Sequence, residues 1–288
     1  MLLKEYRDYF KTELLPVYDE KEIDSFFYIT LEAFHQMKRV DLVLKPDFEL
    51  DGMQLLQWET VLHQLKEEKP IQYIFEETEF FGLPFYVNEN VLIPRPETEE
   101  LVEWIINSVP EIAGDRKIKI LDIGTGSGCI AVSLAKNLPE AEVFAIDVSE
   151  KALEVARRNA RQNEASVTFW HQDILNTDIL SETFDIIVSN PPYVRNLEKQ
   201  EIAKNVLDFE PHLALFVEDH DPLLFYRKIT QLATKNLNRN GLLFFEINQY
   251  LGKEMEDLLQ EYAFENIELR KDIYENDRMT KAVRKSYS

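Results

Sequence analysis

The stretch IKILDIGTGSG, residues Ile118–Gly128, decides the fold of this chain. Its first half, through Asp122, has the apolar pattern of a buried strand, and three of the eight glycines of the whole chain follow within five residues. Apolar residues at helical spacing then run through Cys129–Leu138. A glycine-rich turn between a strand and a helix lets backbone approach a ligand at a helix N-terminus. The sequence therefore predicts a strand, a ligand-binding loop and a helix in succession.

From residue 96 onward, the same alternation of strand and helix continues. Several predicted strands are apolar almost throughout, which is typical of a parallel sheet covered on both faces by helices. We expect helices over Glu97–Asn107, Cys129–Leu138, Glu150–Gln162 and Pro222–Leu237. We expect strands over Ile118–Asp122, Glu142–Asp147, Val167–Gln172, Phe184–Ser189 and Leu242–Ile247, with Asn266–Arg270 and Met279–Arg284 closing the sheet.

The first part of the chain has a different hydrophobic pattern and few glycines. Residues 1–75 carry apolar residues at helical spacing and only one glycine, which predicts a small all-helical domain. Ile71–Phe80 is rich in β-branched and aromatic residues, and a turn signal at Gly82 separates it from Phe85–Leu92. We therefore expect a β-hairpin linker over residues 76–95, followed by a catalytic domain over residues 96–288.

Acidic residues narrow the choice of ligand for the glycine loop. The glycines alone do not decide, because counting from Gly126 and accepting Ala131 also satisfies a relaxed dinucleotide fingerprint. Asp122 ends the first strand, and Asp147 ends the next one, where a carboxylate can accept both ribose hydroxyls. This arrangement resembles the S-adenosylmethionine site of class I methyltransferases, a Rossmann-like α/β fold with a seven-stranded, mostly parallel sheet.

The resemblance implies which residues contact the cofactor. The residue after the third strand faces the adenine in that superfamily, and an apolar neighbour packs on the ring. The expected cofactor-binding residues are Asp122, Gly124, Thr125, Gly126, Ser127, Gly128, Asp147, Asp173, Ile174 and Asn190.

The tetrapeptide Asn190-Pro191-Pro192-Tyr193 directly follows a predicted strand, so it should border the ligand at the carboxyl edge of the sheet. A conjugated amide or amino nitrogen is a poor nucleophile. Two oxygen atoms that accept hydrogen bonds from its two N–H groups can favour a tetrahedral geometry at this nitrogen. Asn190 offers a side-chain carbonyl, Pro191 offers a backbone carbonyl, and Tyr193 offers a flat face. We expect these four residues to form the catalytic site.

Three further stretches point to a family. They are Pro70–Ile74, Val91–Glu99 with its Ile-Pro-Arg-Pro-Glu-Thr-Glu core, and Phe209–Leu215. With the tetrapeptide, they resemble the HemK/PrmC family of release factor glutamine methyltransferases over nearly the whole chain. We expect Arg95, Glu97 and Thr98 of the second stretch to border the cleft, with stabilisation of the helix N-terminus as the alternative role of Glu97 and Thr98. Asn248 departs from the family pattern, because glycine is common at that position.

The resemblance implies methyl transfer to the glutamine nitrogen of the Gly-Gly-Gln loop in bacterial class I peptide chain release factors. Residues 1–75 would either dock this protein substrate or only support the fold. The alternative is a nucleic-acid N-methyltransferase acting on adenine or guanine, which shares the tetrapeptide.

Composition weakens the nucleic-acid alternative. The net charge of −21 disfavours broad binding to phosphate backbones or to an anionic membrane. The single cysteine, Cys129, excludes an internal disulfide and a cysteine-cluster metal site. No signal peptide or membrane-length apolar run is visible, so we expect a cytoplasmic protein. We also expect a monomer that binds no metal.

Overall fold

The computed structural model describes residues 1–112 and 117–285, and these divide into two compact units. The first unit contains Met1–Glu76 together with Ala203–Phe209, and the second contains Glu77–Ile202 and Glu210–Ser288. Within the described ranges, no helix is long and apolar enough to cross a membrane.

The first unit is helical around one aromatic core. Asp19 and Asp51 cap its two longest helices by accepting from backbone N–H groups in the first turn, as expected of N-cap aspartates. Trp58 is fully buried, and Tyr6 and Phe10 pack edge-on against it. The helices are α1 (Leu3–Leu14), α2 (Glu20–His35), α3 (Arg39–Leu44), α4 (Gly52–Lys66), α5 (Ile71–Phe75) and α9 (Lys204–Phe209).

Ile71–Phe75 is helical, as expected for residues 1–75, although the composition of Ile71–Phe80 is typical of an extended segment. Residues Ile71–Phe75 form the short helix α5, because Pro70 begins it and its carbonyl accepts from the N–H groups of Tyr73 and Ile74. Glu76, in the left-handed conformation, ends the helix. A proline at the start of a helix therefore outweighed the β-branched and aromatic composition.

The second half of that segment is a hairpin, as expected. Strands β1 (Glu77–Phe80) and β2 (Leu83–Tyr86) pair antiparallel around Gly82. Phe80 and Phe85 are buried in the core of the second unit, against helix α6 (Pro96–Ile112) and its neighbours. The hairpin is thus packed as part of the second unit.

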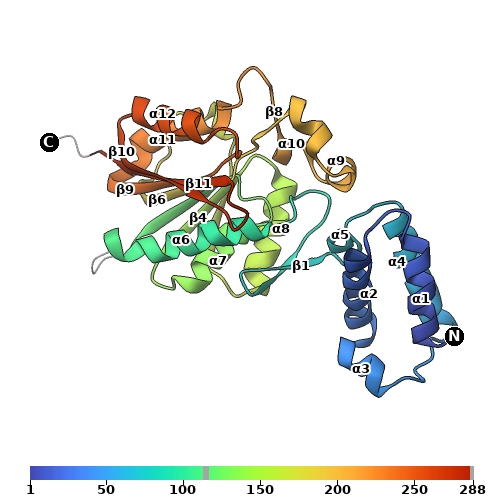
Figure 1. Cartoon of the computed structure of the whole chain (residues 1–288). Helices are drawn as coiled ribbons and strands as arrows, with labels where there is room; N and C mark the ends of the chain where they lie inside the picture. Colours follow the sequence, from blue (N-terminus) through green and yellow to red (C-terminus); the bar gives the residue numbers. More distant parts are fainter. Residues whose placement is uncertain (113–116, 286–288) are drawn as a thin grey trace. The chain divides into compact units, whose positions relative to one another are not determined.

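The second unit is built on a seven-stranded sheet that is mostly parallel, as the sequence predicts. Its strand order is β10-β11-β9-β6-β3-β4-β5, and β11 runs antiparallel to both of its neighbours (Figure 1). The strands are β3 (Lys119–Ile123), β4 (Glu142–Asp147), β5 (Val167–His171), β6 (Phe184–Ser189), β9 (Leu237–Glu246), β10 (Phe264–Lys271) and β11 (Asp277–Arg284).

Helices cover both faces of this sheet, which explains why its central strands are apolar on both sides. Figure 1 shows α6, α7 (Cys129–Asn137) and α8 (Glu150–Gln162) below the sheet, and α11 (Leu224–Asn236) and α12 (Gly252–Glu261) above it. Successive residues of β6 alternate between the two cores, with Ile186 facing one and Ile187 facing the other.

Short elements follow two of the central strands. After β5 comes the one-turn 3₁₀ helix η1 (Ile174–Asn176), and after β6 come β7 (Val194–Arg195) and the 3₁₀ helix η2 (Asn196–Glu201). The connection back to the sheet contains α10 (His212–Leu215) and β8 (Phe216–Val217), which pairs with β7. The sequence patterns did not predict these elements.

Candidate active site

A cavity of about 350 Å³ lies at the carboxyl ends of β3, β4 and β6. Ligands in open α/β sheets bind at this edge. The walls include Ile123 at the end of β3, Asp147 at the end of β4, and Asn190 just beyond β6. The three predicted ligand-bearing strand ends therefore meet in one cavity.

The glycine loop forms one wall of the cavity. Gly124 and Gly126 have φ values of +75° and +54°, a conformation that side chains rarely adopt, and the space beside both is open. The N–H of Gly124 donates to the Ile146 carbonyl at 2.9 Å, which ties the loop to the end of β4. Thr125 and Ser127 also line the cavity. A ligand can therefore approach this backbone closely.

Gly128 has a different role from its two neighbours in the loop. It does not line the cavity, and a Cβ there would lie 3.0 Å from the Cβ of Ala156 on α8. With its φ of +82°, Gly128 begins α7 and allows close helix packing. Its predicted contact with the cofactor is not seen in the lining of the cavity, and its evident role is structural.

Asp147 presents a carboxylate to the cavity. One of its oxygens accepts from the N–H of Gly126 and the other from the N–H of Ser149, both at 2.9 Å. Burial raises the pKa of Asp147, and these backbone hydrogen bonds oppose the rise. Because each carboxylate oxygen has two lone pairs, Asp147 can accept hydroxyl groups as well.

Asp122 lies behind the cavity wall. It is fully buried, and its Oδ2 atom accepts from the Thr125 hydroxyl at 2.6 Å, while Oδ1 has no hydrogen-bond partner. Burial raises the pKa of Asp122 to about 7, although the Thr125 hydrogen bond opposes this. The residue supports the conformation of the loop and leaves one acceptor uncommitted.

Asp173 and Ile174 both line the cavity at the start of η1. The two carboxylate oxygens of Asp173 accept from the Leu175 N–H at 2.9 Å and from the Asn176 amide at 2.6 Å. Asp173 is therefore the cap of this short helix as well as a candidate acceptor. Ile174 is nearly fully buried and gives the cavity an apolar surface.

The tetrapeptide after β6 forms the opposite side of the site. Asn190, Pro191 and Pro192 line the cavity, whereas Tyr193 lies behind them and packs against the core. The side-chain amide nitrogen of Asn190 donates to Thr98 Oγ1 over 3.4 Å. Three of the four predicted catalytic residues thus reach the cavity directly.

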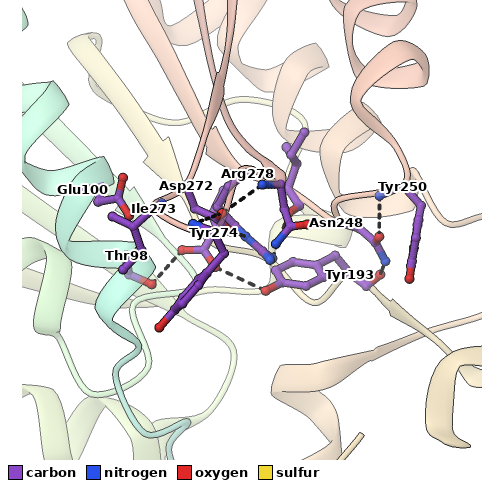
Figure 2. A network of polar contacts seen from close by, with 12 residues as sticks. Thr98, Glu100, Tyr193, Asn248, Tyr250, Asp272, Ile273, Tyr274 and Arg278 are labelled. Carbon is purple, nitrogen blue, oxygen red and sulfur yellow. Dashed lines mark hydrogen bonds and ion pairs between the residues drawn. The ribbon is translucent and has the colours of Figure 1, made fainter. Parts of the chain in front are cut away.

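A buried carboxylate that the sequence analysis did not single out lies behind this tetrapeptide. Glu246, at the end of β9, accepts from the hydroxyls of Thr98 at 2.6 Å and Tyr193 at 3.2 Å. Figure 2 shows both hydroxyls directed at the same carboxylate. The signal was present, because Glu246 is the one acid in the otherwise apolar run Leu242–Ile247.

Two of the stretches that carry the family resemblance meet beside the cavity. Buried Glu210 accepts from the backbone N–H of Ile93 at 3.2 Å and from Arg95 at 2.5 Å. Arg95 and Thr98 line the cavity, whereas Glu97 does not. The pair Arg95–Glu210 therefore fixes the segment that leads into α6.

Two further reactive side chains, Cys129 and His171, have surroundings that favour a structural role. Cys129 lines the cavity, but burial raises the pKa of its thiol to about 12, so it stays protonated and is a poor nucleophile. A ring nitrogen of His171 lies 2.8 Å from the Val148 carbonyl. The part of the chain that the structure describes has no cluster of three or more His, Cys, Asp or Glu side chains that could hold a metal.

These features fit S-adenosylmethionine. The open glycine backbone at Gly124 and Gly126 leaves room for the carboxylate and amine end, and Asp147 can accept ribose hydroxyls. Ile174 offers an apolar surface for the adenine.

Sequence comparison matches two parts of the chain to known protein families. A profile for the methyltransferase small domain matches residues 103–211, and one for the PrmC N-terminal domain matches residues 3–75. The release factor glutamine methyltransferase of Flavobacterium psychrophilum is 70% identical over 98% of this chain and 99% of its own. The protein of that name from Bacteroides thetaiotaomicron is 43% identical over 96% of this chain and 98% of its own.

Solved structures share the fold at low sequence identity. The hMettl16 catalytic domain, in complex with a MAT2A 3′UTR hairpin, has a TM-score of 0.55 and 19% identity over 73% of this chain and 77% of that one. A methyltransferase from Pyrococcus furiosus has a TM-score of 0.51 and 18% identity over 72% and 91%. The fold and the site together define a class I S-adenosylmethionine-dependent methyltransferase. Within that class, the chain belongs to the release factor glutamine methyltransferase family.

Proposed function

We propose that this protein transfers a methyl group from S-adenosylmethionine to the side-chain amide nitrogen of glutamine in the Gly-Gly-Gln motif of class I peptide chain release factors. Family membership supports the substrate, because relatives that match nearly the whole chain carry the name release factor glutamine methyltransferase. The cavity beside Asn190 supports the chemistry.

The orientation of the Asn190 side chain carries the proposal. Its nitrogen is engaged by Thr98, which leaves Oδ1 free to accept an N–H from a substrate amide in the cavity. The Pro191 carbonyl is the second acceptor, and Pro192 restricts the backbone that presents it. Two acceptors on the two N–H groups orient the nitrogen lone pair for attack in line with the methyl group.

The co-substrate supplies an activated methyl group when bound. In the proposed site, the glycine loop and Asp147 hold it, with Asp173 and Ile174 at its adenine end. The amide nitrogen bonds to the methyl carbon, the carbon–sulfur bond breaks with its electron pair on sulfur, and the nitrogen releases one proton to solvent. Because positive charge develops on that nitrogen, the oxygens of Asn190 and Pro191 stabilise it without a strong base.

The helical unit that contains residues 1–75 is proposed to dock the release factor. A folded protein substrate needs a broad contact surface in addition to a site for one side chain. We further propose that the enzyme acts as a cytoplasmic monomer, without stable binding to nucleic acid and without a metal. The strongly acidic composition is consistent with a protein substrate.

The nucleic-acid alternative is not favoured. The RNA-bound neighbour shares the fold at 19% identity, whereas relatives that share sequence along nearly the full length are named for release factors. The test is one incubation of the protein with labelled S-adenosylmethionine and separate pools of release factor, DNA and RNA. We expect label in the release factor. Label in either nucleic acid, with none in the release factor, would overturn the proposal.

A further inference from the structure

The side chain of Glu246 joins two parts of the site that are far apart in sequence. It is 2% exposed, and its Oε2 and Oε1 atoms accept from the Thr98 hydroxyl at 2.6 Å and the Tyr193 hydroxyl at 3.2 Å. Thr98 lies in the first turn of α6, and Tyr193 ends the tetrapeptide (Figure 2). One carboxylate thus restrains both the α6 wall and the tetrapeptide wall of the cavity.

The direction of these hydrogen bonds fixes the Asn190 amide. An ionised carboxylate can only accept, so Thr98 donates its single hydroxyl proton to Glu246. Thr98 Oγ1 can then act only as an acceptor toward Asn190, and it faces the amide nitrogen, 3.4 Å away. The carbonyl oxygen of Asn190 is therefore the atom left for the cavity. Without the carboxylate, the hydroxyl could also donate, and either amide orientation would be satisfied.

Surrounding contacts hold this network rigid. The Tyr226 hydroxyl donates to the backbone carbonyl of Glu246 at 3.2 Å, and the Asn248 amide donates to the Tyr193 carbonyl at 3.1 Å. Burial raises the pKa of Glu246, while the Thr98 hydrogen bond and the positive charge of Arg278 oppose the rise. Arg278 is itself fixed by buried Asp272 at 3.0 Å.

We propose that Thr98 and Glu246 are positioning residues for methyl transfer. Their hydrogen bonds turn the Asn190 carbonyl oxygen toward the substrate amide and hold the Tyr193 ring against the tetrapeptide. This inference rests on the proposed function, because it assigns Asn190 as the acceptor for the glutamine N–H. Neither residue exchanges a proton with the substrate, so their effect passes through Asn190 and Tyr193.

Substitutions of Thr98 separate positioning from packing. Thr98→Val keeps the shape but removes the hydroxyl, whereas Thr98→Ser keeps the hydroxyl. Thr230→Val is the matched control, because Thr230 is fully buried on α11 and its hydroxyl has no partner. We expect Thr98→Val to lower kcat for release factor by about tenfold or more, with Thr98→Ser within about threefold of wild type and Thr230→Val unchanged. The affinity for S-adenosylmethionine should change by less than about threefold in each.

A double-mutant cycle tests whether Thr98 acts through Asn190. In an Asn190→Ala background, Thr98→Val should lower the residual rate by less than about twofold. If Thr98→Val alone leaves kcat near wild type, or if its loss is equally large in that background, the inference is wrong.

Glu246→Gln provides a second variant should Thr98→Val fold poorly. It keeps the shape but places an N–H opposite one of the two hydroxyls, so we expect a loss of about tenfold in kcat with cofactor affinity retained. A normal kcat in this variant would also overturn the inference. If the wild-type protein transfers no methyl group to release factor, the proposed function is wrong, and the positioning inference that rests on it is then wrong as well.

Discussion

Asp122 lies one residue before the end of β3 and Asp147 ends the neighbouring parallel strand β4, yet their surroundings give the two carboxylates different properties. Asp147 accepts from two backbone N–H groups and lines the cavity. Asp122 is sealed behind the loop with one hydroxyl donor, and burial raises its pKa to about 7. The same residue type therefore lines the cavity in one strand and is a buried support for the loop in the next.

The raised pKa of Asp122 makes stability depend on pH. Between its ordinary value of 3.8 and about 7, the folded state binds a proton that the unfolded chain releases, so stability falls as pH rises through this window. Asp122→Asn removes that dependence. We expect the unfolding free energy of the variant, relative to wild type, to increase by about 1–4 kcal/mol from about pH 5.5 to about pH 8. Urea unfolding at a series of pH values measures it, and a constant difference would contradict the assignment.

Removal of the Asp147 side chain should affect the cofactor directly. Asp147→Ala deletes the proposed acceptor for the ribose hydroxyls, one hydrogen bond from Gly126 of the glycine loop and one from Ser149. We expect binding of S-adenosylmethionine to weaken by about 1–3 kcal/mol, the range for a hydrogen bond to a charged group. Isothermal calorimetry is the measurement, and an unchanged dissociation constant would show that the acceptor lies elsewhere.

At this scale, the sequence predicted the residues that reach the cavity from strand ends, because strand register and glycine patterns are local. It did not predict that Gly128 serves helix packing or that Asp122 and Tyr193 lie behind the wall. It also missed the pairing of Thr98 with Glu246, which are 148 residues apart. Contacts between residues that are so far apart in sequence depend on how the strands of the sheet are arranged.

At the scale of elements, one side chain joins the hairpin to the glycine loop. Asn159 on α8 is fully buried; its Oδ1 accepts from the Tyr86 N–H at 2.7 Å, and its amide donates to the carbonyls of Tyr86 and Ser127 at 2.9 Å and 2.8 Å. Asn163, one turn later, donates to the Pro84 carbonyl at 2.8 Å. The hairpin thus helps to hold the loop that lines the cavity.

Asn159→Ala should destabilise the second unit. It leaves one N–H and two carbonyls without their partner, which costs about 1–3 kcal/mol for each group that water does not reach. Asn137→Ala is the control, because Asn137 is exposed on α7 and donates only within its own helix, so we expect a change of less than about 0.5 kcal/mol. Chemical denaturation compares the two, and equal small effects would mean that Asn159 does not fix the hairpin.

The strands of the large sheet and most of the long helices were predictable from the sequence, with ends that differ by a few residues, but helix α12 was not predicted. The apolar runs of β6 and β9 and the N-terminal proline of α6 are strong local signals. Helix α5 lies within the predicted helical region 1–75, but its bounds were not predicted because Ile71–Phe75 also has the composition of a strand. The short elements from β7 to β8 have weak propensities, and their conformation depends on contacts with the rest of the unit.

At the scale of the whole molecule, the proposed docking role of the helical unit rests on the size of the substrate. Helix α3 has no buried residues and exposes Val43 at 77% and Leu44 at 70%. Apolar side chains that are this exposed are candidates for a contact surface. The family profile for the PrmC N-terminal domain covers this helix.

Charge on α3 should weaken docking while leaving the chemistry intact. For the double variant Val43→Asp and Leu44→Asp, we expect KM for intact release factor to rise by about fivefold to tenfold. Cofactor affinity and turnover of a short Gly-Gly-Gln peptide should stay unchanged. Ile179→Asp is the control, because Ile179 is 66% exposed in the second unit. A normal KM for release factor in the double variant would show that α3 does not contact it.

Mapping the methylated residue tests the central claim most directly. Release factor is incubated with S-adenosylmethionine and either the wild-type protein or Asn190→Ala, and the product is digested and analysed by tandem mass spectrometry. We predict one methyl group on the side-chain nitrogen of the Gly-Gly-Gln glutamine, formed on the order of 10²–10³ times more slowly by Asn190→Ala. A methyl group on a different residue, or near-normal transfer by Asn190→Ala, would contradict the account.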